Sequence, residues 1–464
     1  MLYIKKRNFF IAIVLTVIIT CGFTLTLLNF TSASEKENDS FEKLYSAYDT
    51  LKQEYYKKID DEKLVEGAVK GMVESLDDPY TSYMDLKESE GFEENISSSF
   101  EGIGAEVTET NGYIMIVSPI KGSPAEKAGL KPRDKILKVD NKSVEGMSVN
   151  EAVSLIRGEK GTKVSLEIER DGVGTLTFTI TRDTIPIETV YSEVVENKIG
   201  KIQITKFSEN TGKELADALT ELKEKKVKGI VLDLRQNPGG LMDQAITMSN
   251  MFVDKGKKIL QVEAKDGSKD IYKAENQPIV DVPVVVITDN GTASAAEIMA
   301  AALNESEGIP IVGEKTFGKG TVQSAKTFED GSSMKYTIAK WLTPSGKWIH
   351  EKGIEPQYKV TLPEYAHLPY LNPEKTLQEG DVSTEVKTAE KMLQALGYKT
   401  DVDGYFDKAL KNTVVAFQRD HQLKQTGKIS QDTTIKLMDL VREKIEKNDT
   451  QMKKAIEVLK SKME

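Results

Sequence analysis

The pattern of hydrophobic and polar residues divides the chain into segments of different kinds. The first is a nearly uncharged run from Asn8 to Phe30, which follows the basic residues 5–7. Its length matches a hydrocarbon core, and this predicts a signal anchor in residues 1–33 with the rest of the chain outside the membrane. A cleaved signal peptide is the alternative, because the small residues 31–33 form a cleavage site.

Residues 38–97 and 98–183 differ in their hydrophobic period. In the first segment apolar residues recur three and four positions apart, which predicts amphipathic helices that cover a core or pair with a second copy. In the second segment short β-branched runs surround one helical stretch at 148–157, which predicts a small, mostly β unit.

Residues 184–365 have a β/α pattern with two glycine-containing turns. The strand-like GIVLDLR leads through NPGG (237–240) into a helical segment, and VPVVVITD leads through NGTAS (290–294) into another. Strands that feed helices in this way form a largely parallel, buried sheet, with functional residues at the carboxyl ends of the strands. We therefore expect the chemistry at these two turns.

The C-terminal part of the chain is helical in pattern. A compact unit is predicted at 375–443, beyond a proline-punctuated segment. Residues 444–464 form a charged helical tail, which we interpret as a solvated helix, with a role in subunit association as the alternative.

Composition narrows the function classes. The 464 residues suggest about three domains at roughly 100–200 residues each. The net charge of -10 argues against a nucleic-acid partner. A single cysteine excludes an internal disulfide, and with three histidines it provides no ligand set for a Cys/His zinc site.

Ser294 ends the second turn and stands at the start of a predicted helix. Backbone N–H groups point outward there, and the helix dipole favours a developing negative charge, which suits a nucleophile. Glu297 follows three residues later, so the pair also fits a capping box, in which the hydroxyl only satisfies the helix end. The local sequence leaves both interpretations open.

Lys319 lies between Gly318 and Gly320 in GEKTFGKGTVQ. As a general base toward Ser294 it would need a neutral amine near pH 7, far below the ordinary lysine pKa of about 10.4. Burial without a close carboxylate lowers a lysine pKa by up to ~3–5 units. Gln323 offers an uncharged side chain to hold the amine, and a lysine exposed in a glycine turn is the alternative interpretation.

Two other chemistries compete for the same region. Gly313, Gly318 and Lys319 match the start of a phosphate-binding loop, but Gly320 stands where the magnesium-binding Ser or Thr belongs and no helix is predicted to follow. A Ser-His-Asp site would need His350, and no G-x-S-x-G turn is present to display a serine beside it. We interpret His350 as structural.

Together these segments resemble the C-terminal processing peptidases, also called tail-specific proteases, from about Phe41 to Tyr358. The matching motifs occur in the expected order: GIGAEV, GSPAEKAGLKPRDKILKVD, VLDLRQNPGG, NGTASAAEI, GEKTFGKGTVQ and GIEP. The resemblance implies a multidomain α/β fold, in which a crotonase-like β/α protease core carries an inserted, mostly β domain and a small all-α C-terminal domain.

The resemblance also implies the site residues. Ser294 is the nucleophile, Lys319 its general base and Gln323 the residue that orients the lysine. Ala296 stands where a second serine is common, which leaves the catalytic role in place. No cofactor is expected. Three backbone N–H groups are expected to form the oxyanion hole: those of Gly239, Gly240 and Ala295.

The segment 98–183 resembles a PDZ domain, which implies recognition of C-terminal tails. Its loop Gly102-Ile103-Gly104 would receive the terminal carboxylate of a substrate, whose chain adds as a strand. Arg157 would sense this peptide or link the domain to the protease, and a solvated helix end is the alternative interpretation.

Residues 382–440 are similar to a small three-helix peptidoglycan-binding domain, with LGY, DGYFD and VVAFQRDHQL as the matching motifs. A helical domain for self-association is the alternative. If the resemblance holds, cell wall is a nearby partner.

We therefore expect a membrane-tethered or secreted serine endopeptidase that cleaves extracytoplasmic proteins with exposed, apolar C-terminal tails. Its expected partners are these proteins, peptidoglycan, the membrane through residues 1–33 and a second copy of the chain in a homodimer; nucleic acid is not expected. The alternative function is a non-catalytic scaffold that tethers partners through the PDZ and wall-binding domains.

Overall fold

The structure is a computed structural model that describes residues 41–110 and 112–463. The predicted signal anchor or signal peptide at 1–33 lies outside these residues. Among the described helices none is both long enough and apolar enough to cross a membrane. The described chain forms two compact units, residues 41–86 with 325–336 and residues 87–324 with 337–463.

The first unit contains the amphipathic helices expected near the N-terminus. Residues 41–54 are helical, and α2 (Asp61–Glu74) begins after Asp60, whose carboxylate accepts from the amides of the first turn. Strand β1 (Ser82–Met84) pairs antiparallel with the start of β18 (Ser333–Leu342). Large apolar side chains are exposed along these helices and the loop between them: Phe41, Leu44, Tyr45, Leu51, Tyr55, Tyr56, Val65 and Met72.

A six-stranded sheet organises the second unit, in the order β10-β11-β12-β15-β16-β19. β10 is antiparallel to β11 and the other neighbours are parallel, which confirms the predicted β/α arrangement. The strands are β10 (Val190–Val195), β11 (Ile199–Ile204), β12 (Gly229–Asp233), β15 (Val284–Thr288), β16 (Ile311–Gly313) and β19 (Tyr358–Lys359).

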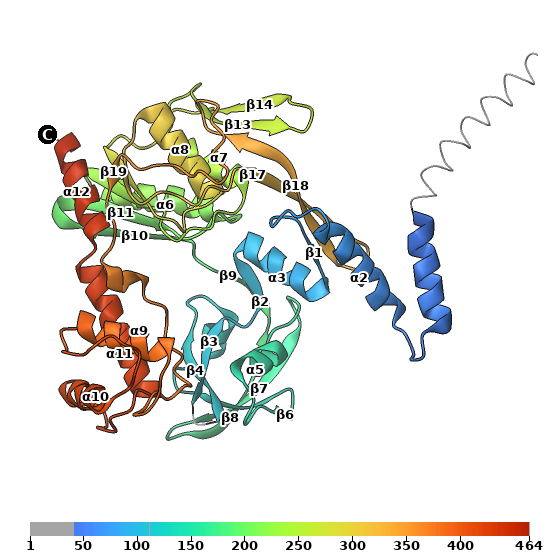
Figure 1. Cartoon of the computed structure of the whole chain (residues 1–464), viewed down its shortest axis with the longest axis vertical. Coiled ribbons are helices and arrows are strands. Elements are labelled where there is room, and N and C mark those ends of the chain that lie inside the picture. The colour runs from blue at the N-terminus through green and yellow to red at the C-terminus, as the bar shows by residue number, and fades with distance from the viewer. Residues whose placement is uncertain (1–40, 111, 464) are drawn as a thin grey trace, which may run out of the picture. The chain divides into compact units, whose positions relative to one another are not determined.

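Both faces of this sheet are covered. Alternate residues such as Leu232 and Val286 pack against α6 (Thr211–Glu224), α7 (Met242–Ser249) and α8 (Ala295–Glu307). Val231 and Val285 point the other way and pack against α12 (Thr450–Met463), which lies along the opposite face in Figure 1. All residues of β12, β15 and β16 are consequently buried.

The C-terminal segment differs from the sequence-based prediction in two ways. Residue 444 lies inside α11 (Gln431–Lys447), so the last helix is a separate element that begins at Thr450. This helix is not fully solvated, because Ala455 and Leu459 are completely buried against the sheet. The charged residues of the segment occupy the remaining faces of a helix that belongs to the β/α core.

The inserted unit is mostly β, as predicted. A sheet of order β3-β4-β5-β7-β8, with β6 beside β5, packs against α4 and α5. Strands β2 and β9 pair antiparallel where the chain enters and leaves the unit, after helix α3 (Leu86–Ser97). The elements are β2 (Ser99–Gly102), β3 (Ala105–Thr110), β4 (Tyr113–Pro119), α4 (Pro124–Ala128), β5 (Lys135–Val139), β6 (Lys142–Ser143), α5 (Val149–Ile156), β7 (Lys163–Arg170), β8 (Gly174–Thr181) and β9 (Asp183–Pro186).

The remaining elements complete the core and the small all-α unit. β13 (Lys258–Ala264) pairs with β14 (Lys269–Lys273) and with the last residues of β18, and β17 (Thr321–Thr327) also pairs with β18. The C-terminal unit packs α9 (Thr384–Ala395), α10 (Lys408–Asp420) and α11 around its own apolar core. Two short 3-10 helices are Glu196–Lys198 and Glu364–His367.

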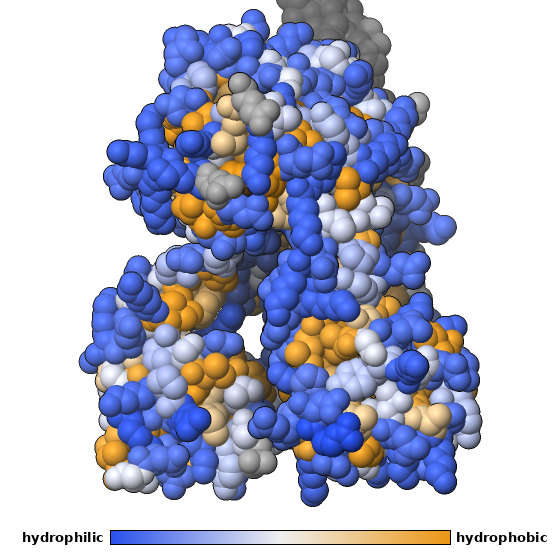
Figure 2. Space-filling model, turned by 90° about the vertical axis from the view of Figure 1, so that its left-hand side faces the viewer, coloured by the Kyte–Doolittle hydropathy of each residue, from blue (hydrophilic) through white to orange (hydrophobic). Residues whose placement is uncertain are grey.

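Hydrophilic residues predominate on the face of the molecule shown in Figure 2. On the face shown in Figure 2, apolar residues form separate patches among hydrophilic ones. This pattern agrees with a chain in which charged residues make up 29%.

Leu459 tests whether α12 belongs to the β/α core. Truncation by Leu459→Ala leaves a cavity beside the sheet and should lower the free energy of unfolding by roughly 2–4 kcal/mol. The measurement is urea denaturation, followed by the fluorescence of the two tryptophans, which lie in the β/α core. The control Lys453→Ala, at an exposed position of the same helix, should change the value by less than about 0.5 kcal/mol. Equal midpoints for both variants would show that the helix contributes no core packing.

Candidate active site

Ser294 lies where the sequence predicts it, between the end of β15 and the first residue of α8. Its backbone has φ 53° and ψ −117°, a conformation that costs energy for a residue with a side chain. The residue is partly exposed, whereas its neighbours Ala293 and Ala295 are buried. A serine held at a strained turn and open to solvent is placed as a nucleophile requires.

The carboxylate of Glu297 joins the serine and lysine segments. It accepts from the amides of Ser294 and Lys319 at 2.8 Å each, from the amide of Gly318 at 2.7 Å and from the Thr316 hydroxyl at 2.6 Å. The side chain is fully buried. Burial raises the pKa of Glu297, and these hydrogen bonds oppose the increase. One carboxylate therefore holds the backbones of Ser294 and Lys319 within two hydrogen-bond lengths of each other.

Both tryptophans of the chain fix the backbone around Lys319. The Trp341 indole donates to the carbonyl oxygen of Lys319 at 2.8 Å, and the Trp348 indole donates to that of Gly320 at 2.9 Å. His350 stacks on Trp348 and accepts from the Gly320 amide at 3.3 Å. His350 thus has contacts of the structural kind that the sequence predicts.

The segment after Lys319 is a strand, β17, which excludes the phosphate-binding loop because that motif requires a helix. Gln323 lies on this strand, and its amide nitrogen donates to the hydroxyls of Thr321 at 2.9 Å and Thr337 at 3.4 Å. Its expected contact with the lysine amine stays a prediction.

The glycine pair of the first turn lies against Ser294. A methyl group at Gly239 would lie 2.8 Å from Ser294 Cβ and 2.8 Å from the Ala295 nitrogen, and one at Gly240 would lie 2.0 Å from the Phe207 oxygen. Phe207 donates to the Gly239 carbonyl at 2.9 Å. Only glycine fits at these two positions, which also have φ of 93° and 142°.

The expected oxyanion donors differ in their availability. The Gly239 amide donates to Asn237 Oδ1 at 2.8 Å, so it is already engaged. Within the described residues, the amides of Gly240 and Ala295 have no intramolecular acceptor. The amide of Gly239 therefore shapes the turn, while the other two remain able to bind an oxyanion.

The mostly β unit places the expected carboxylate-binding loop at the end of β2. Gly104 has φ 73°, and a methyl group there would lie 2.5 Å from Ser123 Cβ. The carbonyl oxygens of Ile103 and Gly104 accept from neighbouring residues, whereas their amides have no acceptor in the part of the chain that is described.

Arg157 follows α5 and connects it to α3. Its guanidinium pairs with the carboxylate of Glu94 at 2.9 Å and lies 4.8 Å from the centre of the Phe100 ring. The side chain is 42% exposed. Arg157 therefore contacts the helix that precedes the inserted unit rather than only solvent.

Comparison with known proteins identifies the core. The model of Peptidase family S41 matches residues 198–360. A carboxy-terminal processing protease CtpA of Bacillus subtilis is 57% identical over 465 residues, which cover 99% of this chain and 100% of that protein. The chain belongs to peptidase family S41. As a member of this family it is a serine protease, and the non-catalytic scaffold is excluded as its class.

Further comparisons cover the other units of this S41 protease. The carboxy-terminal processing protease CtpB of Bacillus subtilis is 43% identical and covers 92% of this chain and 91% of its own length. The model of the activating protease CtpB N-terminal domain matches residues 24–88, that of a PDZ domain matches 115–170 and that of a peptidoglycan-binding domain matches 382–437. The solved photosystem II D1 C-terminal processing protease is 31% identical, covers 70% of this chain and 88% of its own, and has a TM-score of 0.42.

Some residues of the site are not predicted by local sequence patterns. Glu297 is visible as half of a capping box, but its contacts with the Lys319 segment depend on the tertiary fold. The motifs do not predict the tryptophan contacts or the hydrogen bond from the Gly239 amide to Asn237. Two tryptophans within eight positions of one segment are nevertheless a usable signal.

Replacement of Glu297 by glutamine tests its positioning role. In glutamine an NH2 group replaces one carboxylate oxygen, so two of the four groups that donate to Glu297 lose their acceptor. Glu297→Gln should therefore lower the free energy of unfolding by roughly 2–4 kcal/mol and lower kcat. Peptidase assays and urea denaturation of the full chain provide the measurements. Glu305→Gln, on the same helix and bonded to the Ser345 amide, is the control and should leave kcat unchanged. Wild-type kcat in Glu297→Gln would contradict the role.

Proposed function

We propose that the chain cleaves exported proteins near exposed, apolar C-terminal tails, with Ser294 as nucleophile and Lys319 as general base. The main observation in support is that the carboxylate of Glu297 accepts hydrogen bonds from the backbone amides of both residues. Ser294 also lies against the turn that contains Gly240. Membership of family S41 supports a serine nucleophile, and Ser294 occupies the strained, partly exposed position that such a residue needs.

The reaction proceeds through an acyl-enzyme. Ser294 Oγ attacks the carbonyl carbon of the scissile peptide while its proton passes to the Lys319 amine, which Gln323 orients. The resulting oxyanion accepts from the amides of Gly240 and Ala295. The C–N bond then breaks, the leaving amine takes the proton from Lys319, and water deprotonated by Lys319 hydrolyses the ester on Ser294.

Substrate tails bind at the PDZ domain, with the terminal carboxylate on the amides of the loop Gly102-Ile103-Gly104. The amides of Ile103 and Gly104 that lack an intramolecular acceptor in the described chain support this assignment. An apolar tail suits a strand-like peptide packed against α5.

The wall-binding domain and the N-terminal segment indicate where the enzyme is located in the cell. The match to a peptidoglycan-binding domain supports an extracytoplasmic enzyme. A pocket of about 530 Å³, lined by Glu390, Tyr398, Tyr405 and Asp407 among others, offers polar and aromatic groups to a wall fragment. The anchor in residues 1–33 and the homodimer stay predictions.

Peptide recognition is coupled to the active site through α3. Arg157 binds Glu94, and the next residue, Asn95, accepts from the Lys206 amine at 2.9 Å. The backbone of the following residue, Phe207, donates to Gly239 and accepts from Leu241 on either side of Gly240. We infer that a bound tail shifts this chain of contacts and so opens the site.

Ser294→Ala and Lys319→Ala test the catalytic pair in the full chain. Each change removes a group that takes part in every bond rearrangement, so each should lower cleavage of an unfolded protein with an apolar C-terminus by at least roughly 10³-fold. Electrophoresis of the products and labelling with a serine-reactive probe provide the readouts. Lys315→Ala, at an exposed lysine four residues upstream, should retain activity. Equal cleavage by all variants would remove this site from consideration.

Arg157→Gln tests the coupling. We expect the preference for a tailed substrate over the same protein with a charged tail to fall roughly fivefold or more, with a small effect on stability because the ion pair is partly exposed. The preference is measured as a ratio of kcat/KM values. Glu94→Gln should act non-additively with it, while Arg133→Gln, at an exposed arginine of the same domain, should have no effect. An unchanged ratio in Arg157→Gln would show that the domain only recruits substrate.

A further inference from the structure

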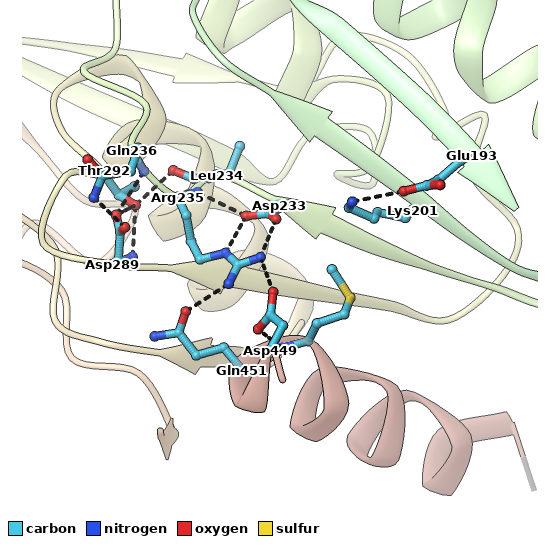
Figure 3. Close-up of polar contacts among 11 residues, drawn as sticks. Glu193, Lys201, Asp233, Leu234, Arg235, Gln236, Asp289, Thr292, Asp449 and Gln451 are labelled. Carbon is cyan, nitrogen blue, oxygen red and sulfur yellow. Dashed lines mark hydrogen bonds and ion pairs between the residues drawn. The ribbon is translucent and has the colours of Figure 1, made fainter. Parts of the chain in front are cut away.

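A nearly buried arginine connects the glycine turn to the C-terminal helix. Arg235 lies two residues after the end of β12 and two residues before Asn237. Its guanidinium donates to both carboxylate oxygens of Asp233 at 2.9 and 2.7 Å, to Asp449 Oδ2 at 2.8 Å and to Gln451 Oε1 at 3.0 Å (Figure 3). The side chain of Arg235 is 14% exposed.

The charge of Arg235 depends on these partners. Burial lowers the pKa of Arg235, but the ion pairs with Asp233 and Asp449 outweigh it and raise the pKa above its ordinary value. A guanidinium in this position stays charged, so the removal of one carboxylate leaves a poorly compensated positive charge beside the turn.

The two distant partners are held on a rigid element. Asp449 precedes α12 and its other oxygen accepts from the Met452 amide at 2.8 Å. Gln451 is fully buried and donates to the Val360 carbonyl at 3.0 Å. Because the helix packs on the sheet through residues such as Leu459, the groups that hold Arg235 have fixed positions.

The turn that begins at Arg235 is bonded to the segment before Ser294. Gln236 has φ 55°, and its amide and side chain donate to Asp289 at 2.9 and 2.6 Å. Asn237 accepts from the Ala293 amide at 2.9 Å through its carbonyl oxygen and from the Gly239 amide through its side chain. A displacement of Arg235 would therefore shift the strained turn and its contacts with the serine loop.

We propose that Asp449 and Gln451 are positioning residues for catalysis, which hold Arg235 and thereby set the turn that carries the Gly240 amide. The last helix of the chain thus completes the protease site from beyond the wall-binding domain. This proposal rests on the proposed function of that turn as an oxyanion-binding element. It predicts an effect on turnover rather than on substrate binding.

Asp449→Asn and Gln451→Met in the full chain test the proposal. Asp449→Asn keeps the oxygen that caps α12 and removes the charge that faces Arg235, while Gln451→Met keeps the length of the side chain and removes its polar atoms. We expect kcat per competent site to fall roughly ten- to hundredfold, with KM within about twofold, since the PDZ domain binds the tail. Competent sites are counted by end-point titration with a serine-reactive probe, so partial unfolding does not affect kcat per site. Asp449→Glu should recover part of the loss.

Asp60→Asn is the matched control, because Asp60 caps α2 through the Glu62 amide and has no part in the proposed site. It should leave kcat unchanged. The proposal is overturned if both Asp449→Asn and Gln451→Met have the wild-type kcat per competent site. A change only in the number of competent sites would also overturn it, because that result indicates a role in stability alone. If the wild type and Ser294→Ala were titrated equally, the proposed function would fail instead, so the two failures are distinct.

Discussion

The buried carboxylate of Glu297 is the interaction on which the site depends. Ser294 and Lys319 lie on different loops. Each loop contains a residue with positive φ, Ser294 in the first and Gly318 in the second, and hydrogen bonds hold the backbone there. A carboxylate with two acceptor oxygens can satisfy four donors at once, which no neutral side chain of similar size can do. The cost of its burial, visible in its raised pKa, is offset by those four hydrogen bonds. The geometry of the pair is therefore a property of α8, because Glu297 is fixed in its first turn.

The sheet sets the second constraint. Parallel strands with apolar residues on both faces must be covered on both faces, and the chain does this with elements from opposite ends of the fold. Helices α6, α7 and α8 follow the strands locally, whereas α12 arrives after the whole wall-binding domain. The helix that covers the sheet begins beside the guanidinium of Arg235. One element therefore provides both the packing on this face and the polar contacts at the edge of the sheet.

The sequence was informative where local rules decide the outcome. The β/α pattern predicts the strands that lead to Gly239 and Ser294, and the strand after Lys319 agrees with the rejection of a phosphate-binding loop. The prediction of a solvated tail is wrong, because the apolar stripe of this segment packs against the sheet. That stripe recurs at helical spacing and, with an uncovered face implied by β12, it was a readable signal. The recurring positions are Met452, Ala455, Ile456, Leu459 and Met463. Contacts such as that of Asn237 with Gly239 were not readable, because they depend on the turn being strained against Phe207 and the serine loop.

Both binding modules are attached to the protease at two points. The PDZ domain enters through β2 and leaves through β9, which pair with each other. The wall-binding domain leaves the core at Thr361 and returns at Thr450, where the Thr450 hydroxyl donates to the Thr361 carbonyl at 2.7 Å. A module held at one end can swing without effect on its neighbour, whereas a module held at two adjacent points must move those points together when it moves. At the PDZ attachment the Ser98 hydroxyl donates to that of Ser208, the residue after Phe207, and the wall-binding domain returns to the core at the start of α12. The proposed coupling between the PDZ domain and the site is consistent with a module attached in this way.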